Sequence, residues 1–298
     1  MIVLTLLGWT SIPLFLKHFT GLIDGWTANG WRYGFSALMW LPVLVWAAMK
    51  HKTPAGLWRA ALPASLFNIG AQICFGLAPY YIDPGLMTFS LRVQIVFVTI
   101  GAVLLFPAER ATIRSWGFLT GIAMVLGGTV SVLLLKPGGL GDGSALGVSL
   151  ALGSGLLYAG YALCVRKHMQ GMNSLIAFAA VSQYTGVALL ACMFVFGKDH
   201  GAQVFELSGK QVFLLLLSAI VGIGIGHTLY YASINRLGLA VSAGVVQLQP
   251  ITVSIGSLLI FQERLTSLQW ACGIVAVCGA GLILWTQGRK KKAVGIRD

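Results

Sequence analysis

Charged residues are scarce in this sequence. Of its 298 residues only 9% are charged, and aspartate and glutamate together number 8. Soluble domains carry roughly 25% charged residues, so this scarcity excludes an ordinary globular protein. The chain is instead 57% hydrophobic with a mean hydropathy of +0.85, in runs that approach the ~20 residues a helix needs to cross a membrane. We therefore predict an all-α integral membrane protein.

The apolar runs themselves contain no aspartate or glutamate. A carboxylate at that depth is expected where a protein exchanges a proton for a cationic substrate, so this mechanism is disfavoured. Clustered carboxylates would also be needed to hold the metal of a membrane enzyme that acts on lipids or prenyl diphosphates. We predict a protein that is not an enzyme and has no catalytic residues, with an integral-membrane enzyme as an alternative.

Cysteine and glycine also lack the spacing of known sites. The five cysteines lie inside apolar runs, and none pairs with a histidine at metal-ligand spacing. They are expected to pack as small hydrophobic residues, without a metal site or a disulfide framework. Gly222, Gly224 and Gly226 also lie within an apolar run, which disfavours a phosphate-binding loop. No cofactor and no metal are predicted.

Ten apolar runs separated by short connections predict ten transmembrane helices. The connections carry turn or charge signals, such as IDPG at 82–85 and KPGGLGDG at 136–143. Met1 enters the first run directly, without a charged leader or a cleavage site, so a signal peptide is not predicted. The predicted spans are 2–17, 26–49, 59–81, 85–106, 115–135, 145–165, 173–197, 210–234, 239–261 and 267–287.

Lysine and arginine are distributed unevenly between the two sides of these spans. Thirteen of the 20 lie on the side that holds both termini, several of them in the tail RKKKAVGIRD at 289–298. Cytoplasmic loops carry the excess of positive charge, so we predict an inner-membrane protein with both termini in the cytoplasm. The net charge of +12 is assigned to contact with anionic lipid headgroups rather than with nucleic acid.

The two halves of the chain resemble each other. PAERATIRSW at 107–116 and FQERLTSLQW at 261–270 share Glu, Arg, Thr and Trp at an offset of 154 residues. Just upstream the offset is 155, which pairs Gln94 with Gln249. We predict two five-helix repeats, 1–144 and 145–298, the second of which carries the basic tail.

An odd number of spans in each repeat means that the second repeat enters the membrane upside down relative to the first. Such inverted-topology repeats recur in secondary transporters, where two equivalent halves supply the inward-open and outward-open states. The repeat therefore predicts transport by alternating access.

Three stretches are similar to one protein family. LLGWTSIPLFLKHF, NGWRYGFSALMWLPV and YYASINRLGLAVSAGVVQLQPITVSIGSLLIFQERLT resemble the ten-helix EamA-like members of the drug/metabolite transporter superfamily. The most specific element runs from Pro250 to Glu263 and Arg264, whereas the first half has Ile95 at the counterpart of Pro250. The resemblance implies export of small metabolites, often amino acids or related compounds. It also implies that spans 115–135 and 267–287 lie outside the central bundle.

Arg92 lies in the middle of the predicted span 85–106. A charge at this depth costs roughly 2.5–3.5 kcal/mol on insertion scales, so it needs a partner, a wet cavity or a function. The repeat register pairs Arg92 with Gln247, and we predict that both line a central cavity in which Arg92 meets a carboxylate. Gln94 and Gln249 are predicted to pack between helices. The alternative is a structural Arg92, satisfied by neighbouring carbonyls or glutamines.

Further polar and aromatic residues are predicted to bind substrate with Arg92. Asn68 and Gln72 lie four residues apart on one helical face, and Gln72 corresponds to His227 at the offset of 155. His227 shares a face with Tyr230 and Tyr231, and as a lone intramembrane histidine it is equally a packing residue or a ligand or proton site. The remaining aromatic candidates, for which packing is the alternative, are Trp9 and Tyr158.

Two kinds of charged residue are predicted to lie at the membrane interface. Arg32 belongs to a polar stripe that should face the bundle interior, but it lies near the end of its span and is predicted to snorkel to the interface. Glu109 and Glu263 lie at helix ends beside arginines and are predicted to form salt-bridged caps.

A secondary transporter of small polar metabolites, such as amino acids or related carboxylate-bearing compounds, accounts for these features. Its predicted partners are the substrate and the lipid bilayer, and a homodimer is compatible with the sequence. A proton-coupled exchanger of another metabolite or drug class, using His227 or His18, is the alternative within transport. A membrane scaffold without transport activity would leave Arg92 unexplained.

Overall fold

The structure is a computed structural model that describes residues 1–106, 115–135, 142–227, 229–230, 233 and 245–293. Every regular element among these residues is a helix. The α-helices are α1 (Ile2–Phe19), α2 (Gly25–Met49), α3 (Leu57–Leu77), α4 (Pro84–Leu91), α5 (Gln94–Leu105), α7 (Trp116–Leu134), α8 (Asp142–His168), α9 (Ser174–Phe196), α10 (Gly209–Ala219), α13 (Gln249–Phe261) and α14 (Ser267–Ala293). The short elements are two 3₁₀ segments, η1 (Ala78–Tyr80) and η3 (Lys198–Glu206), and a π-helix, η4 (Ile220–Ile225).

Seven helical segments of the described chain are long and apolar enough to cross a membrane. They are Ile2–Phe19, Leu57–Tyr80, Pro84–Ala102, Trp116–Leu134, Ser144–His168, Ser174–Phe196 and Ser267–Thr286. α2 has the length to span, with 25 residues, but carries polar residues along one face. α13 has 13 residues and follows a stretch that lies partly outside the described residues. The protein is thus a multi-span helical protein, while the count of ten spans stays a prediction.

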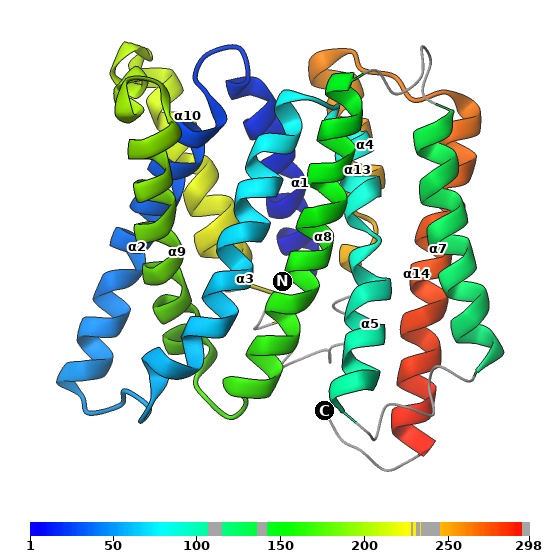
Figure 1. Cartoon of the computed structure of the whole chain (residues 1–298), viewed down its shortest axis with the longest axis horizontal. Coiled ribbons are helices and arrows are strands. Elements are labelled where there is room, and N and C mark those ends of the chain that lie inside the picture. The colour runs from blue at the N-terminus through cyan, green and yellow to red at the C-terminus, as the bar shows by residue number, and fades with distance from the viewer. Residues whose placement is uncertain (107–114, 136–141, 228, 231–232, 234–244, 294–298) are drawn as a thin grey trace.

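The helices run side by side along a common direction (Figure 1). α2 packs against α9 at one edge of the bundle, and α7 packs against α14 at the other edge. α3 packs against α8, and α1, α4 and α13 contact one another in the interior. The α7–α14 pair lies beside this interior, where the family resemblance placed spans 115–135 and 267–287.

Small residues allow α7 and α14 to approach each other closely. A Cβ added at Gly121 would lie 2.9 Å from the carbonyl oxygen of Gly279, and one added at Gly279 would lie 2.7 Å from the carbonyl oxygen of Gly121. Either side chain would push the two backbones apart. Membrane helices use such small-residue contacts because lipid supplies no hydrophobic effect to draw them together.

The predicted span 85–106 is broken into α4 and α5 at Arg92 and Val93. Around the break, backbone N–H groups donate to the carbonyl three residues back instead of four. The N–H of Val93 donates to the carbonyl of Ser90 at 3.3 Å, and that of Ile95 donates to the carbonyl of Arg92 at 3.1 Å. These i→i−3 bonds tighten the helix locally, and a short stretch of this kind within a helix often marks a hinge.

A second break with similar geometry precedes α13. The turn at 247–248 comes 155 residues after the turn at 92–93, and the N–H of Leu248 again donates three residues back, at 3.1 Å. Pro250 lies in the first turn of α13, where its missing N–H is tolerated. The first break has Ile95 at that position, so proline is not required for the helix to break there.

Candidate functional site

The two helix breaks face each other, and Arg92 joins them. Its Nη1 donates to the backbone carbonyl of Val246 at 3.3 Å and to Oε1 of Gln247 at 3.5 Å. Its Nη2 donates to Oε1 of Gln249 at 3.0 Å. Arg92 is only 6% exposed, and its Nε has no hydrogen-bond partner. All three acceptors are neutral oxygens, and no described carboxylate forms an ion pair with the guanidinium.

Gln249 packs between helices and also binds Arg92, a contact that the sequence does not predict. The repeat register assigned it to helix packing, on the arc opposite Gln247, yet it binds Arg92 at a shorter distance than Gln247 does. Its bonds to Arg92 and to α1 agree with the predicted packing between helices. The predicted face is wrong because that prediction assumed an unbroken helix, in which successive residues turn by a constant angle. The turn at 247–248 changes that angle and brings both amides to the same guanidinium.

Gln249 also connects Arg92 to α1. Its Nε2 donates to the backbone carbonyl of Trp9 at 2.8 Å. Thr10 directly follows Trp9, and Thr252 lies about one turn after Gln249; their hydroxyls are hydrogen-bonded to each other at 2.6 Å. Arg92 is therefore held between α4 and α13, and α13 is held in turn against α1.

Aromatic rings gather next to this connection. The ring of Trp9 lies 4.9 Å from that of Tyr230 and 5.3 Å from that of His227, and His227 lies 4.7 Å from Phe178, as centroid distances. Trp9 and His227, predicted separately, are thus in contact. Helical spacing predicts Tyr230 on the same face as His227, whereas no sequence pattern points to Phe178.

The π-helix η4 supplies a polar edge to this aromatic group. The Nε1 of Trp9 donates to the carbonyl of Gly222, within η4, at 3.2 Å. Nearby, Nδ1 of His227 is buried and has no hydrogen-bond partner. Single π turns inside α-helices are frequent at functional sites. The glycines at 222, 224 and 226, which are poor helix formers, are the sequence signal for this irregularity.

Asn68 and Gln72 belong to a separate polar network between α2, α3 and α9. Nδ2 of Asn68 donates to Oγ1 of Thr185 at 2.9 Å, and Nε2 of Gln72 donates to Oδ1 of Asn68 at 3.4 Å. Nδ2 of Asn29 donates to the backbone carbonyl of Gln72 at 2.9 Å. The bonds described for these amides link the three helices and do not reach Arg92. Buried amides of this kind need such partners, because an unpaired one is costly.

Arg32 does not reach the interface, contrary to the prediction. It is 2% exposed, and its Nε donates to Oγ of Ser218 on α10 at 2.8 Å. Because α2 begins at Gly25, Arg32 lies about 10 Å inside the helix, at 1.5 Å per residue. A polar partner inside the bundle is therefore nearer than the interface. Three tyrosines lie near Arg32: Tyr33, Tyr80 and Tyr158.

Tyr158 is placed away from the aromatic group at Trp9. Tyr158 packs on Phe75, with ring centroids 6.2 Å apart, and lies near Arg32 rather than beside Trp9. Tyr231 and Glu109 lie outside the described residues.

Three charged side chains, Lys17, Asp83 and Glu263, join three helices at the end of the bundle where α1 ends, and we call them the Lys17 cluster. Nζ of Lys17 lies 3.1 Å from Oε1 of Glu263 and 3.6 Å from Oδ1 of Asp83, and Ser257 donates to the Glu263 carboxylate. The predicted pairing of Glu263 with its neighbour Arg264 is wrong. α13 ends at Phe261 and the chain turns sharply, so adjacent side chains diverge and Glu263 points to α1.

The environment of Glu263 raises the pKa of its carboxyl. Burial raises the pKa of this carboxyl above its ordinary value, and the nearby charge of Asp83 acts in the same direction. Hydrogen bonds from Ser257 and Lys17 act in the opposite direction without cancelling the effect of burial.

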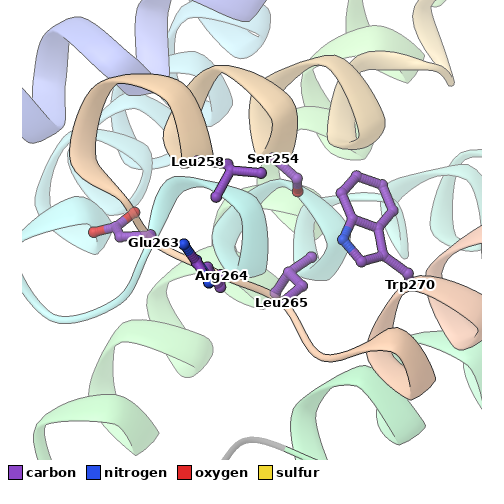
Figure 2. Close-up of a pocket in the computed structure, with 6 residues that line it drawn as sticks. All are labelled: Ser254, Leu258, Glu263, Arg264, Leu265 and Trp270. Atoms are coloured by element: carbon purple, nitrogen blue, oxygen red, sulfur yellow. The ribbon is translucent and has the colours of Figure 1, made fainter.

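Two pockets lie away from Arg92. One, of about 280 Å³, opens beside the Lys17 cluster (Figure 2) and is lined by Ser254, Leu258, Glu263, Arg264, Leu265 and Trp270. The other, of about 270 Å³, lies between α2 and η4 and is lined by Met39, Trp40, Val43, Gly224, Ile225 and Leu229. Neither pocket contains a residue predicted to bind substrate. No group of three His, Cys, Asp or Glu side chains in the described part of the chain could hold a metal ion.

Comparison with known proteins decides the family. The sequence profile of the EamA-like transporter family matches residues 1–134 and 145–285. The chain belongs to the EamA-like transporter family. The resemblance inferred from the sequence is thereby confirmed, and membership points to a multi-pass membrane transporter rather than an enzyme.

The chain is also similar to a curated protein and to a solved structure. The uncharacterized protein PA1977 of Pseudomonas aeruginosa is 28% identical over 261 residues, which cover 84% of this chain and 81% of that protein. A solved structure, described only as the crystal structure of a protein, shares the fold with a TM-score of 0.66 at 15% identity. That similarity covers 97% of this EamA-like chain and 96% of the solved one.

Proposed function

We propose that this EamA-like protein is a secondary transporter for small metabolites that carry a carboxylate, such as amino acids or related compounds. The uncompensated charge of Arg92 is the main support. Taking an ion out of water costs several kcal/mol, which is offset only by an opposite charge and good hydrogen bonds. Arg92 has neutral acceptors and an unpaired Nε. A substrate carboxylate would supply the missing charge and accept the Nε–H.

The neighbours of Arg92 favour a substrate with an apolar part as well. Gln249 binds both Arg92 and the backbone of Trp9, so the guanidinium and the aromatic group are held at a fixed separation. The rings of Trp9, Tyr230 and Phe178 offer stacking and apolar surface. A metabolite with a carboxylate at one end and an apolar or aromatic group at the other matches this arrangement.

Alternating access between two inverted five-helix repeats is the proposed mechanism. The breaks at 92–93 and 247–248 lie at corresponding positions of the proposed repeats 1–144 and 145–298. Broken helices of this kind surround the binding sites of many secondary transporters, because the break frees backbone groups at the membrane midplane. In this scheme ten helices cross the inner membrane, with both termini in the cytoplasm.

The Lys17 cluster suggests which end is closed. Lys17, Asp83 and Glu263 tie α1, α4 and α13 together at the end of the bundle opposite the C-terminal end of α14 (Figure 1). In the proposed topology this end faces away from the cytoplasm. The structure then corresponds to a state closed toward the outside, and these ion pairs must separate when the site opens there.

The test is counterflow in proteoliposomes with labelled amino acids, organic acids, sugars and quaternary amines. Wild type is expected to exchange a carboxylate-bearing compound, and Arg92→Gln is expected to lose that exchange. Arg59→Gln, which removes an exposed arginine, is the matched control and should transport normally. Exchange of sugars or cations alone, or an unimpaired Arg92→Gln variant, would refute the proposed substrate class.

A proton-coupled exchanger is the second candidate function, favoured by the unpaired Nδ1 of buried His227. If His227 carries the coupled proton, an imposed pH gradient should drive uptake in wild type but not in His227→Gln. Equal responses of the two proteins would remove His227 from the coupling step.

A further inference from the structure

The pocket beside the Lys17 cluster contains a buried hydroxyl without a partner. Ser254 is 4% exposed, and its Oγ forms no hydrogen bond. Serine and threonine inside membrane helices normally donate to the carbonyl four residues back, as Ser90 does to Leu86 and Thr99 does to Ile95. A buried hydroxyl that lacks this bond costs about 1–3 kcal/mol, which indicates a missing partner. Ser254 lines the pocket (Figure 2).

Two more donors surround the same space. Arg264 forms no ion pair with any described residue, since the neighbouring carboxylate of Glu263 points to Lys17. Figure 2 shows the Glu263 carboxylate directed away from the other side chains, whereas the Trp270 ring nitrogen faces the interior of the pocket. No hydrogen bond from Arg264 or from the Trp270 ring is present among the described residues. A hydroxyl, a guanidinium and an indole N–H thus converge on one pocket.

The carboxylate of Glu263 would repel an anion from this pocket, but its charge is partly compensated. Lys17 lies 3.1 Å from Glu263 and compensates its charge, and Ser257 donates a hydrogen bond to it. Burial also raises the pKa of Glu263, which favours the uncharged carboxyl. The net charge offered to a ligand therefore comes from Arg264.

We propose that this pocket binds an anionic group, a phosphate or a carboxylate, at a site distinct from that of Arg92. Arg264 supplies the charge, Ser254 and Trp270 supply single hydrogen bonds, and Leu258 and Leu265 contact the carbon chain next to the anion. The two polar ends of the site lie where α13 ends and α14 begins, at the level where Arg and Trp meet lipid headgroups. A phospholipid phosphate and a water-soluble phosphate ester share this chemistry.

Native mass spectrometry of the purified full-length protein in detergent separates the two sources. One arm adds phosphatidylglycerol, and the other adds glycerol phosphate. Retention of one phosphatidylglycerol would identify a lipid site, whereas saturation by glycerol phosphate without lipid retention would identify a soluble ligand. Either result supports an anion site if it depends on Arg264. This readout does not require transport, so it is independent of the fate of the Arg92 proposal.

Variants test the assignment of the donors. Arg264→Gln should weaken binding at least about tenfold, while Ser254→Ala and Trp270→Phe should each weaken it about threefold to tenfold. Arg264→Lys keeps the charge and should bind better than Arg264→Gln. Lys210→Gln, which removes an exposed cation, should bind as wild type does. Equal binding by wild type and a folded Arg264→Gln, or no binding of either probe to wild type, would overturn the proposal.

Discussion

Arg92 and Arg32 are both buried inside the bundle, but their surroundings differ. Arg92 lies at a break in the helix and is held by three oxygens from the segment 246–249. Arg32 lies within the continuous helix α2 and donates to the hydroxyl of Ser218. The two exposed fractions, 6% and 2%, do not distinguish them. We therefore propose that the backbone around a buried charge, more than its burial, separates a candidate binding group from a packing group.

The break explains the difference physically. An unbroken helix uses its own carbonyls, so an arginine within it must find side-chain partners. A break leaves carbonyls such as that of Val246 available and brings two segments from distant parts of the chain together. We therefore expect Arg92 to act on substrate and Arg32 to act on the packing of α2 against α10.

The largest expected effect is on transport by Arg92 variants. Arg92→Gln should reduce exchange of the carboxylate substrate by at least about 30-fold, because a buried charge partner is typically worth about 2–5 kcal/mol. Arg92→Lys keeps the charge but loses the planar fork, so its rate should be intermediate. Initial rates of counterflow at matched protein content measure both. A similar loss in both variants would mean that geometry, and not charge, is what the site requires.

Arg32 variants should affect stability instead. Arg32→Ala leaves a cavity and should lower the free energy of unfolding by about 2–5 kcal/mol. Arg32→Met fills most of that volume without a charge and should regain most of the stability, with transport retained. Thermal unfolding in detergent and counterflow measure the two properties. A stable Arg32→Met variant that does not transport would make Arg32 a second binding residue and break the comparison.

The partners of Arg92 sharpen the comparison at a smaller scale. Gln249→Leu removes the 3.0 Å acceptor and the bond to Trp9, and should reduce exchange about tenfold, since unpaired buried donors cost ~1–3 kcal/mol. Gln247→Leu removes a contact of 3.5 Å and should have a smaller effect. Substrate affinity measured on both variants tests this order, and the reverse order would favour the original assignment from the repeat.

The smallest expected effect is on the pH dependence of stability in a Glu263→Gln variant, because Glu263 is a paired charge near water. The pKa of the Glu263 carboxyl is raised in the folded protein. Its contribution to the free energy of unfolding is therefore fully present below the ordinary pKa of about 4.3 and is lost as the pH rises through the raised value. The melting temperature of wild type minus that of Glu263→Gln should therefore fall between pH 4 and pH 7. A difference that grows with pH would show that the ion pair with Lys17 outweighs burial.

Much of the fold could be predicted from the sequence, because apolar runs and their charged flanks are set by the membrane. The turn signals between runs place most helix ends within a few residues of those found. The break at Arg92 could not be predicted in this way, since no proline or glycine marks it. The break at 247–248 has Pro250 nearby, yet its effect on side-chain direction depends on local backbone geometry.

For the same reason, only part of the candidate site can be predicted from the sequence. Arg92 was identified because a charge within an apolar run is conspicuous. The predicted face of Gln249 is wrong because a helical arc does not continue unchanged through a break. Arg32 was placed at the interface because the sequence does not reveal that Ser218, far along the chain, lies within hydrogen-bond distance.

The most direct test of the central claim compares a carboxylate substrate with its primary amide. Titration calorimetry would give the affinity of each ligand for wild type and for Arg92→Gln, using the compound identified by counterflow. If Arg92 is the counter-charge of the substrate, wild type will prefer the carboxylate and Arg92→Gln will lose that preference. The same preference in both proteins would contradict the account and make Arg92 a structural residue.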